Sequence, residues 1–145
     1  MTEEIVFDPA NVSAAWPSLR ERAGLVHAQS PEDPAGVADL LGEIELMLLE
    51  IADVLREIND QRYAAERAHS KAYNLALADY AAAHPVTVAR SMAKTSTLEE
   101  KKAHDDLRAL FHHAEDTQTA LKTKHIGLLG INKNMTPLIQ SGFRR

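Results

Sequence analysis

The sequence predicts an all-α protein, a long antiparallel helical hairpin that is coiled-coil-like and oligomeric, with a short helical cap at its N-terminus. Three observations predict this class. The prolines leave two long uninterrupted stretches, between Pro34 and Pro85 and between Pro85 and Pro137, and proline breaks helix interiors. Apolar residues recur in both stretches at alternating intervals of three and four. The chain of 145 residues, 45% of them hydrophobic, has the length of a single domain with a core.

The cap is expected within residues 1–34. Asp8-Pro9 resembles a helix start, and Trp16-Pro17 restarts or kinks that helix. Two starts are open for the helix that follows. One is a capping serine in Ser30-Pro31, and the other is a capping aspartate in Asp33-Pro34.

The first arm of the hairpin is expected at about residues 35–83. Its apolar stripe is interrupted only by Gln61, and in the N-terminal half it is wider than one partner helix requires. That width favours a bundle or a homo-oligomer. The stripe consists of Val37, Leu40, Ile44, Met47, Ile51, Val54, Ile58, Ala65, Ala68, Ala72 and Leu75. The residues predicted to form the oligomer interface are Leu40, Ile44, Met47, Leu48, Ile51 and Leu55.

The second arm is expected at about residues 86–136, followed by a basic C-terminal tail. A polar residue in such a stripe usually fixes helix register, and this is the structural interpretation of Lys124. Gly127 and Gly130 either allow a close helix crossing or loosen the end of the arm. The stripe consists of Ala103, Leu107, Leu110, Ala114, Thr117, Leu121, Lys124, Leu128, Ile131, Met135 and Leu138.

Charge is distributed unevenly along the chain. Residues 1–60 hold 13 acidic and three basic residues, whereas residues 61–145 hold eight acidic and 13 basic ones. No acidic residue lies between Asp79 and Glu99, or anywhere after Asp116. A basic region can attract a polyanion even when the whole protein is acidic, as this one is with a net charge of −5.

The cations around Pro85 are the candidate nucleic-acid-binding residues. Treated as one helix, the second arm carries its cations opposite the apolar stripe, and the hairpin brings the first arm's cations beside them. A tyrosine such as Tyr63, Tyr73 or Tyr80 can stack on a base. The structural alternative is a solvated helix face with ordinary i,i+4 pairs, Lys101/Asp105 and Lys102/Asp106. The candidates are Arg67, Lys71, Arg90, Lys94, Lys101 and Arg108.

Several classes of protein are not indicated. Without cysteine the chain has no disulfide, thiol nucleophile or thiolate zinc site. No apolar run is long enough for a membrane span, and the first residues do not resemble a secretory signal, so a cytoplasmic protein is expected. His112 and Asp116 share a helix face but make a poor metal site, and no catalytic motif is present, so neither an enzyme nor a cofactor or metal site is expected.

Within residues 61–137 the chain resembles the UvsY-like recombination mediator proteins of phages. The resemblance rests on Lys71-Ala72-Tyr73-Asn74-Leu75 with Tyr80, then Arg90-Ser91-Met92-Ala93-Lys94, then a long C-terminal helix. It implies an α-helical fold, a ring-like homo-oligomer and binding of single-stranded DNA, with loading of a recombinase where a single-strand-binding protein already sits. It also implies that Lys71, Arg90 and Lys94 contact the DNA. The acidic first 60 residues are not part of this resemblance.

The sequence therefore favours a single-stranded-DNA-binding accessory protein that acts as a homo-oligomer, with a recombinase and a single-strand-binding protein as further partners. The alternative is a structural or assembly protein, such as a coiled-coil spacer, a chaperone or a regulator that binds only protein.

Overall fold

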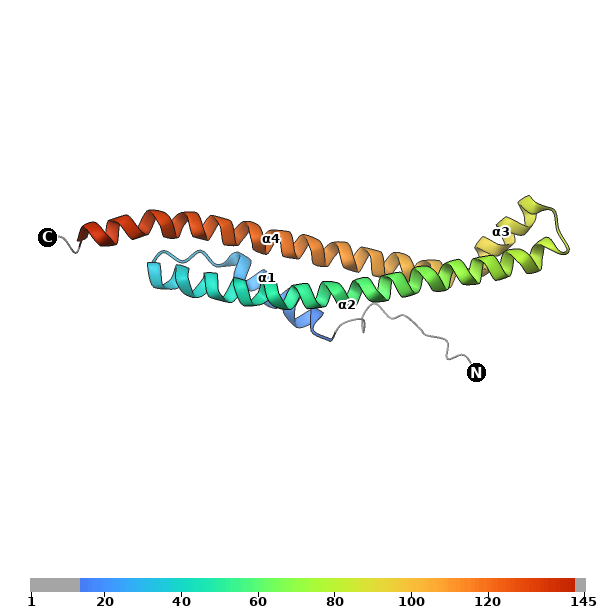
Figure 1. Ribbon diagram of the computed structural model, residues 1–145, viewed down its shortest axis with the longest axis horizontal. Helices are drawn as coiled ribbons and strands as arrows, with labels where there is room; N and C mark the ends of the chain where they lie inside the picture. The colour runs from blue at the N-terminus through green and yellow to red at the C-terminus, as the bar shows by residue number, and fades with distance from the viewer. Residues whose placement is uncertain (1–13, 143–145) are drawn as a thin grey trace. The chain divides into compact units, whose positions relative to one another are not determined.

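The computed structural model describes the backbone of residues 14–142 and the side chains of residues 14–134, and in this range the regular elements are four α-helices (Figure 1). In chain order they are α1 (Trp16–Ala28), α2 (Pro34–Ala81), α3 (Val86–Ser96) and α4 (Leu98–Gly142). The predicted all-α class is confirmed. The predicted helix start at Asp8-Pro9 and the last two cations of the basic tail, Arg144 and Arg145, lie outside the described residues.

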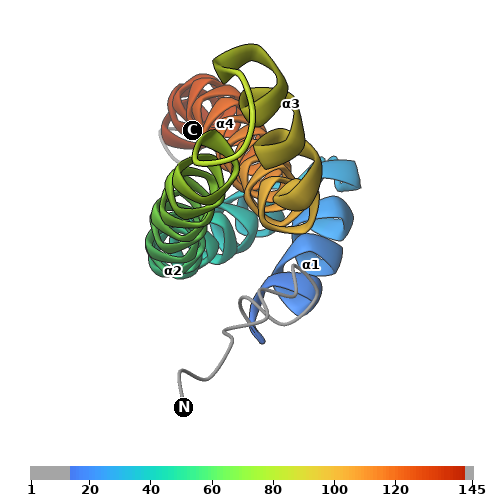
Figure 2. The same cartoon turned by 90° about the vertical axis from the view of Figure 1, so that its right-hand side faces the viewer.

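The chain divides into two compact units. The described part of one is Ala14 with Arg56–His112; it contains α3 and is called the α3 unit below. The other combines Ala15–Leu55 with the chain from His113 onward and is called the α1 unit. Both long helices contribute to both units, and within each unit their segments run antiparallel (Figures 1 and 2).

The α1 unit is a three-helix arrangement with an apolar centre. In α1 the buried residues are spaced by three and four, as an amphipathic helix requires. The Trp16 ring meets the His113 ring of α4 edge to face, with the centroids 5.6 Å apart. Helix α1 begins at Trp16, with proline in its first turn. The buried α1 residues are Trp16, Leu19, Ala23 and Val26.

The most deeply buried positions of the two long helices recur every seven residues. This spacing keeps one seam of each helix turned towards its antiparallel neighbour. The predicted stripe is thereby confirmed as far as Ala65 in α2, and in α4 at every seventh position from Leu107 to Leu128. The seven-residue ladders are Val37, Ile44, Ile51, Ile58 and Ala65 in α2, and Leu107, Ala114, Leu121 and Leu128 in α4, each at most 3% exposed.

The start of α2 settles the choice between the two capping residues. The Gly36 backbone N–H donates to Asp33 Oδ2 at 2.9 Å, and the Val37 N–H donates to the Asp33 carbonyl at 3.0 Å. Asp33 is therefore the N-cap and Pro34 the first helical residue, where its missing N–H costs nothing. Ser30 is not the cap.

Replacing Asp33 by alanine is expected to lower the free energy of unfolding by about 1 kcal/mol, because the first turn of α2 loses its side-chain acceptor. Chemical denaturation followed by circular dichroism measures this. Asp39→Ala, which removes an exposed carboxylate one turn further into α2, is the matched control and should change stability by less than about 0.5 kcal/mol. Equal effects of the two substitutions would contradict a capping role for Asp33.

The second arm is not one helix, contrary to the prediction. Three consecutive hydroxyl side chains donate to carbonyls of the preceding turn: Thr95 to Ser91 at 3.0 Å, and Ser96 and Thr97 to Ala93 at 3.1 and 2.8 Å. Such bonds compete with the helical ladder. At Thr97 the backbone leaves the helical region, with φ −115° and ψ 22°, so that α3 ends and α4 begins.

The buried face of α2 rotates beyond Ala65, so the predicted stripe is wrong there at Ala68 and Leu75, whereas its third residue, Ala72, is half-buried. Ala68 and Leu75 are exposed, Leu75 by 59%, and the half-buried positions lie one residue later. A helix has about 3.6 residues per turn, so a strict repeat of 3.5 drifts around it. The half-buried positions on the rotated face are His69, Ala72, Tyr73, Ala76, Leu77 and Tyr80.

Two predictions about the C-terminal part of α4 are corrected. The helix does not end before Pro137 but continues to Gly142, although proline cannot supply one of its hydrogen bonds. The close helix crossing considered for Gly127 and Gly130 is absent, because a Cβ atom added at either glycine would meet nothing within 4 Å.

Candidate nucleic-acid interface

The six candidate cations all lie in the α3 unit, and all six are exposed. Helix α2 carries Arg67 and Lys71, α3 carries Arg90 and Lys94, and α4 carries Lys101 and Arg108. The prediction treated the last four as one continuous row. Because the helix breaks at Thr97, they form two rows on two helices.

None of these six cations is bound to a carboxylate of the described chain. The i,i+4 pairs Lys101/Asp105 and Lys102/Asp106 do not form salt bridges there, and Asp105 instead lies 3.9 Å from His104 Nδ1. Long cationic side chains with no partner among the described residues keep their charge available to an anion from solution.

Two other cations of the chain, Arg22 and Lys124, bind groups of the chain itself. The Arg22 guanidinium of α1 binds the Glu50 carboxylate of α2 at 2.5 Å. This hydrogen bond lowers the pKa of Glu50 and raises that of Arg22. Both side chains are nearly half exposed, so the pair contributes little to stability.

Lys124 has the structural role that its position in the apolar stripe suggested. Its Nζ atom donates to the carbonyl oxygen of Gln29, the residue that follows the last turn of α1, at 2.5 Å. A cation at a helix C-terminus also interacts favourably with the helix dipole. Lys124 therefore holds the end of α1 against α4.

Helix α3 contains two cations and no acidic residue. Its inner face is made of Ala89 and Ala93, both completely buried, and these small side chains permit close packing inside the unit. Arg90 and Lys94 lie outside this face and are exposed. Val86 and Val88 are also 58% and 44% exposed, so apolar surface accompanies the charges.

Tyr63 is the one of the three tyrosines named from the sequence that the structure leaves exposed. It is 46% exposed on α2, whereas Tyr73 and Tyr80 are half-buried. The guanidinium carbon of Arg62 lies 5.0 Å from the Tyr63 ring centroid and 4.5 Å from that of Phe111 on α4. The three tyrosines look equivalent in the sequence. Tyr63 lies off the seam formed by Ile58 and Ala65, whereas Tyr73 and Tyr80 lie on the face of α2 that becomes half-buried beyond Ala65.

The acidic first part and the basic second part of the sequence do not fold into separate acidic and basic units. Residues 34–55 of α2 carry five acidic and no basic residues, and they share the α1 unit with the acid-free part of α4 after Asp116. One direct link between these segments joins His125 Nε2 to Glu45 Oε1 at 3.1 Å. Antiparallel folding thus places the acidic segment beside a basic one.

Four of the six residues predicted for the oligomer interface are already buried within a single chain. Leu40, Ile44, Met47 and Ile51 are each at most 2% exposed, in the centre of the α1 unit. The chain's own helices cover these four side chains, and their role in an oligomer interface stays a prediction. Leu48 and Leu55 are only half-buried. The large apolar side chains that remain exposed in the α1 unit are Leu25, Leu46, Leu49, Ile126, Leu129 and Ile131.

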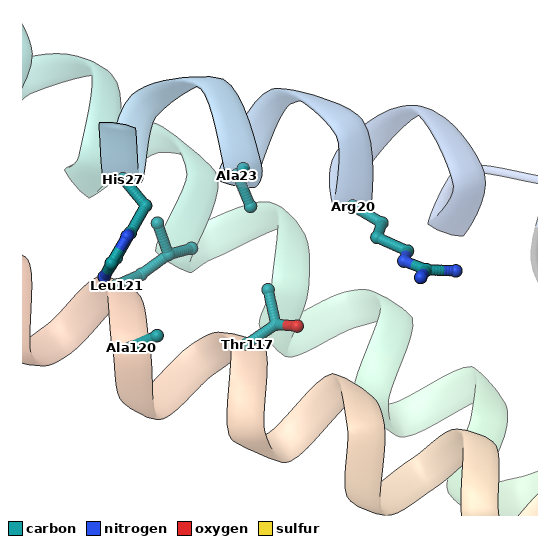
Figure 3. Close-up of a pocket in the computed structure, with 7 residues that line it drawn as sticks. Arg20, Ala23, His27, Thr117, Ala120 and Leu121 are labelled. Atoms are coloured by element: carbon teal, nitrogen blue, oxygen red, sulfur yellow. The ribbon is translucent and has the colours of Figure 1, made fainter. Parts of the chain in front are cut away.

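A groove of about 300 Å³ runs between α1 and α4 in the α1 unit (Figure 3). Arg20, Ala23 and His27 come from α1, and Thr117, Ala120 and Leu121 come from α4. The gap arises because small side chains face each other here and do not fill the space. The groove combines no acid, base and nucleophile in the way that a catalytic site requires.

Three or more histidine or acidic side chains do not come together as a metal site anywhere in the described part of the chain. Over the same residues, no helix is sufficiently long and apolar to cross a membrane. The chain matches no protein-family model, no curated protein and no solved structure.

Proposed function

We propose that this protein binds single-stranded DNA through the α3 unit and acts as an accessory factor in recombination. One observation carries the proposal: the six candidate cations of this unit are all exposed and unpaired in the described chain, whereas Arg22 and Lys124 are engaged elsewhere in its structure. Rows of free cations neutralise phosphates and release counterions, which is the main source of affinity for a flexible strand.

The resemblance to UvsY-like mediators gives this binding a context. Lys71, Arg90 and Lys94, to which the resemblance assigns DNA contact, lie on α2 and α3 of the same unit. By the same resemblance, the further partners are a recombinase and a single-strand-binding protein. The exposed apolar residues of the α1 unit support self-association. An oligomer would bind one DNA strand through the weak sites of several chains, and its overall affinity would exceed that of a single chain.

Fluorescence anisotropy of a labelled single-stranded oligodeoxynucleotide, titrated with the intact protein across a salt series, tests the proposal. The logarithm of the binding constant should fall linearly with the logarithm of the salt concentration. The slope should approach about −4 if all six cations of one chain contact phosphates, since each contact contributes about −0.7. Absence of binding at low salt would refute the proposal.

A second candidate function is that of a structural or assembly protein. The observation that favours it is the exposed apolar side chains of the α1 unit, among which Leu46, Leu49 and Ile126 are 64–69% exposed. Such a protein would associate through these residues whether DNA is present or not. Sedimentation that shows a stable assembly, together with no DNA binding at any salt concentration, would favour this function over the first.

A further inference from the structure

We propose that Tyr63 is the residue on which a base of the bound strand stacks, and that it gives the α3 unit its preference for single-stranded over duplex DNA. The inference rests on the proposed function and adds the feature that free cations lack, because lysine and arginine attract the phosphates of either form. An aromatic face selects an unpaired base, because the bases of a duplex are already stacked on each other.

Tyr63 is the one exposed side chain among the tyrosine, phenylalanine and tryptophan residues of 14–134. The Trp16 ring is buried in the α1 unit, and Tyr73, Tyr80 and Phe111 are half-buried. Half-buried rings contribute mainly to packing. Tyr63 instead keeps 46% of its surface in solvent, on the outer side of α2.

The Tyr63 ring is held in place from one side. The Arg62 guanidinium lies over both the Tyr63 and the Phe111 ring, 5.0 and 4.5 Å from their centroids. Its Nη2 donates to Asn59 Oδ1 at 2.8 Å. Because Arg62 makes these contacts with residues of its own chain, we do not count it among the cations available to DNA phosphates. A cation against one ring face restrains the tyrosine, and a restrained side chain loses less entropy when a base stacks on it.

A cation that can bind a phosphate, Arg67, lies one helical turn from the Tyr63 ring. Arg67 is exposed one helical turn after Tyr63, about 6 Å further along the axis, and Lys71 follows one turn later. A nucleotide stacked on Tyr63 therefore has its phosphate within reach of Arg67. The base-binding and phosphate-binding elements form one line along α2.

The test compares Tyr63→Ala and Tyr63→Phe with the wild type, using single-stranded and duplex oligodeoxynucleotides of the same length. Tyr63→Ala should weaken single-strand binding by about 5- to 150-fold, the range for loss of one stacked base. Duplex binding and the salt slope should not change, because no phosphate contact is removed. Tyr63→Phe should retain single-strand affinity. Leu75→Ala, which truncates another exposed apolar side chain of α2 in the same unit, is the matched control and should behave as the wild type.

A spectroscopic measurement reports the stacking directly. Tyr63→Trp adds one tryptophan to a chain whose single native tryptophan, Trp16, is buried in the α1 unit. Its fluorescence should be quenched by single-stranded DNA and not by a strand of abasic deoxyribose phosphates that binds through charge alone. The wild-type protein, titrated in parallel, gives the contribution of Trp16.

The outcomes separate this inference from the proposed function. Salt-dependent binding by the wild type with unchanged affinity of Tyr63→Ala would overturn the role of Tyr63 and leave the proposed function standing. Equal losses in Tyr63→Phe and Tyr63→Ala would also overturn it, since they would indicate a hydroxyl contact in place of stacking. No binding by the wild type would instead remove the proposed function itself.

Discussion

Removal of three cations from the α3 unit, by Lys71→Ala, Arg90→Ala and Lys94→Ala together, is expected to weaken single-stranded DNA binding by about 10- to 100-fold at low salt. Each exposed charge contact contributes at most about 1 kcal/mol. In the same variant the slope of the logarithm of the binding constant against the logarithm of the salt concentration should become less negative by about 2, because three phosphate contacts are lost. The secondary structure should remain, since all three side chains are exposed and none has a partner in the described chain.

The control for this variant removes the same charge from the other unit. Arg20, Lys122 and Lys133 are exposed residues of the α1 unit, and replacing all three by alanine changes the net charge by the same amount. This second triple variant should bind DNA with nearly wild-type affinity and salt dependence. If both variants weaken binding equally, the DNA responds to the overall charge of the protein, and the α3 unit is not the interface.

Replacing Ile51 by alanine is expected to lower the free energy of unfolding by about 2–5 kcal/mol. The side chain is completely buried in the α1 unit, and its truncation removes apolar contacts and leaves a cavity. Urea denaturation followed by circular dichroism measures the loss. Leu46→Ala, at a position of the same helix that is 64% exposed, should change stability by less than about 0.5 kcal/mol.

This substitution also distinguishes the two interpretations of the apolar face of α2. The sequence assigned Ile51 to contacts between subunits, whereas the structure buries it inside one chain. If Ile51→Ala dissociated an oligomer while the separated chain kept its stability, the interface interpretation would be right. A large loss of stability that does not depend on protein concentration would support the packing within the α1 unit.

The fold class was predictable because helices are determined by residues close together in the sequence, through the spacing of apolar residues and the positions of prolines. The stripe of α2 from Val37 to Ile58, the turn before Pro85 and the cap at Asp33 all depend on residues a few positions apart. The break at Thr97 was not predictable in this way. Serine and threonine are tolerated within helices, and the break results from their hydroxyl groups bonding back to carbonyls, which propensity alone does not reveal.

The candidate site was predictable in its residue types but not in its arrangement. Charged residues on a helix are usually exposed, so the exposure of Arg67 or Lys94 follows from the sequence. That Arg62 is instead enclosed between two rings depends on Phe111, which is far away in the chain. Likewise the rotation of the buried face of α2 beyond Ala65, which covers much of Tyr73, depends on packing in three dimensions.

The seven-residue ladders of α2 and α4 restrict how the length of this protein can change. A single residue inserted into α4 after Thr119 would turn every later position by about 100°, so that Leu121 and Leu128 would leave the seam. An insertion of seven residues at the same place in α4 alone would keep Leu121 and Leu128 on the seam. It would, however, move Lys124 away from Gln29. At this level only insertions or deletions of whole heptads made in α1, α2 and α4 together preserve both, because α1 contacts α4 at His113 before Thr119 and at Lys124 after it. In the α3 unit, paired blocks of seven residues in α2 and α4 are enough to keep the phase.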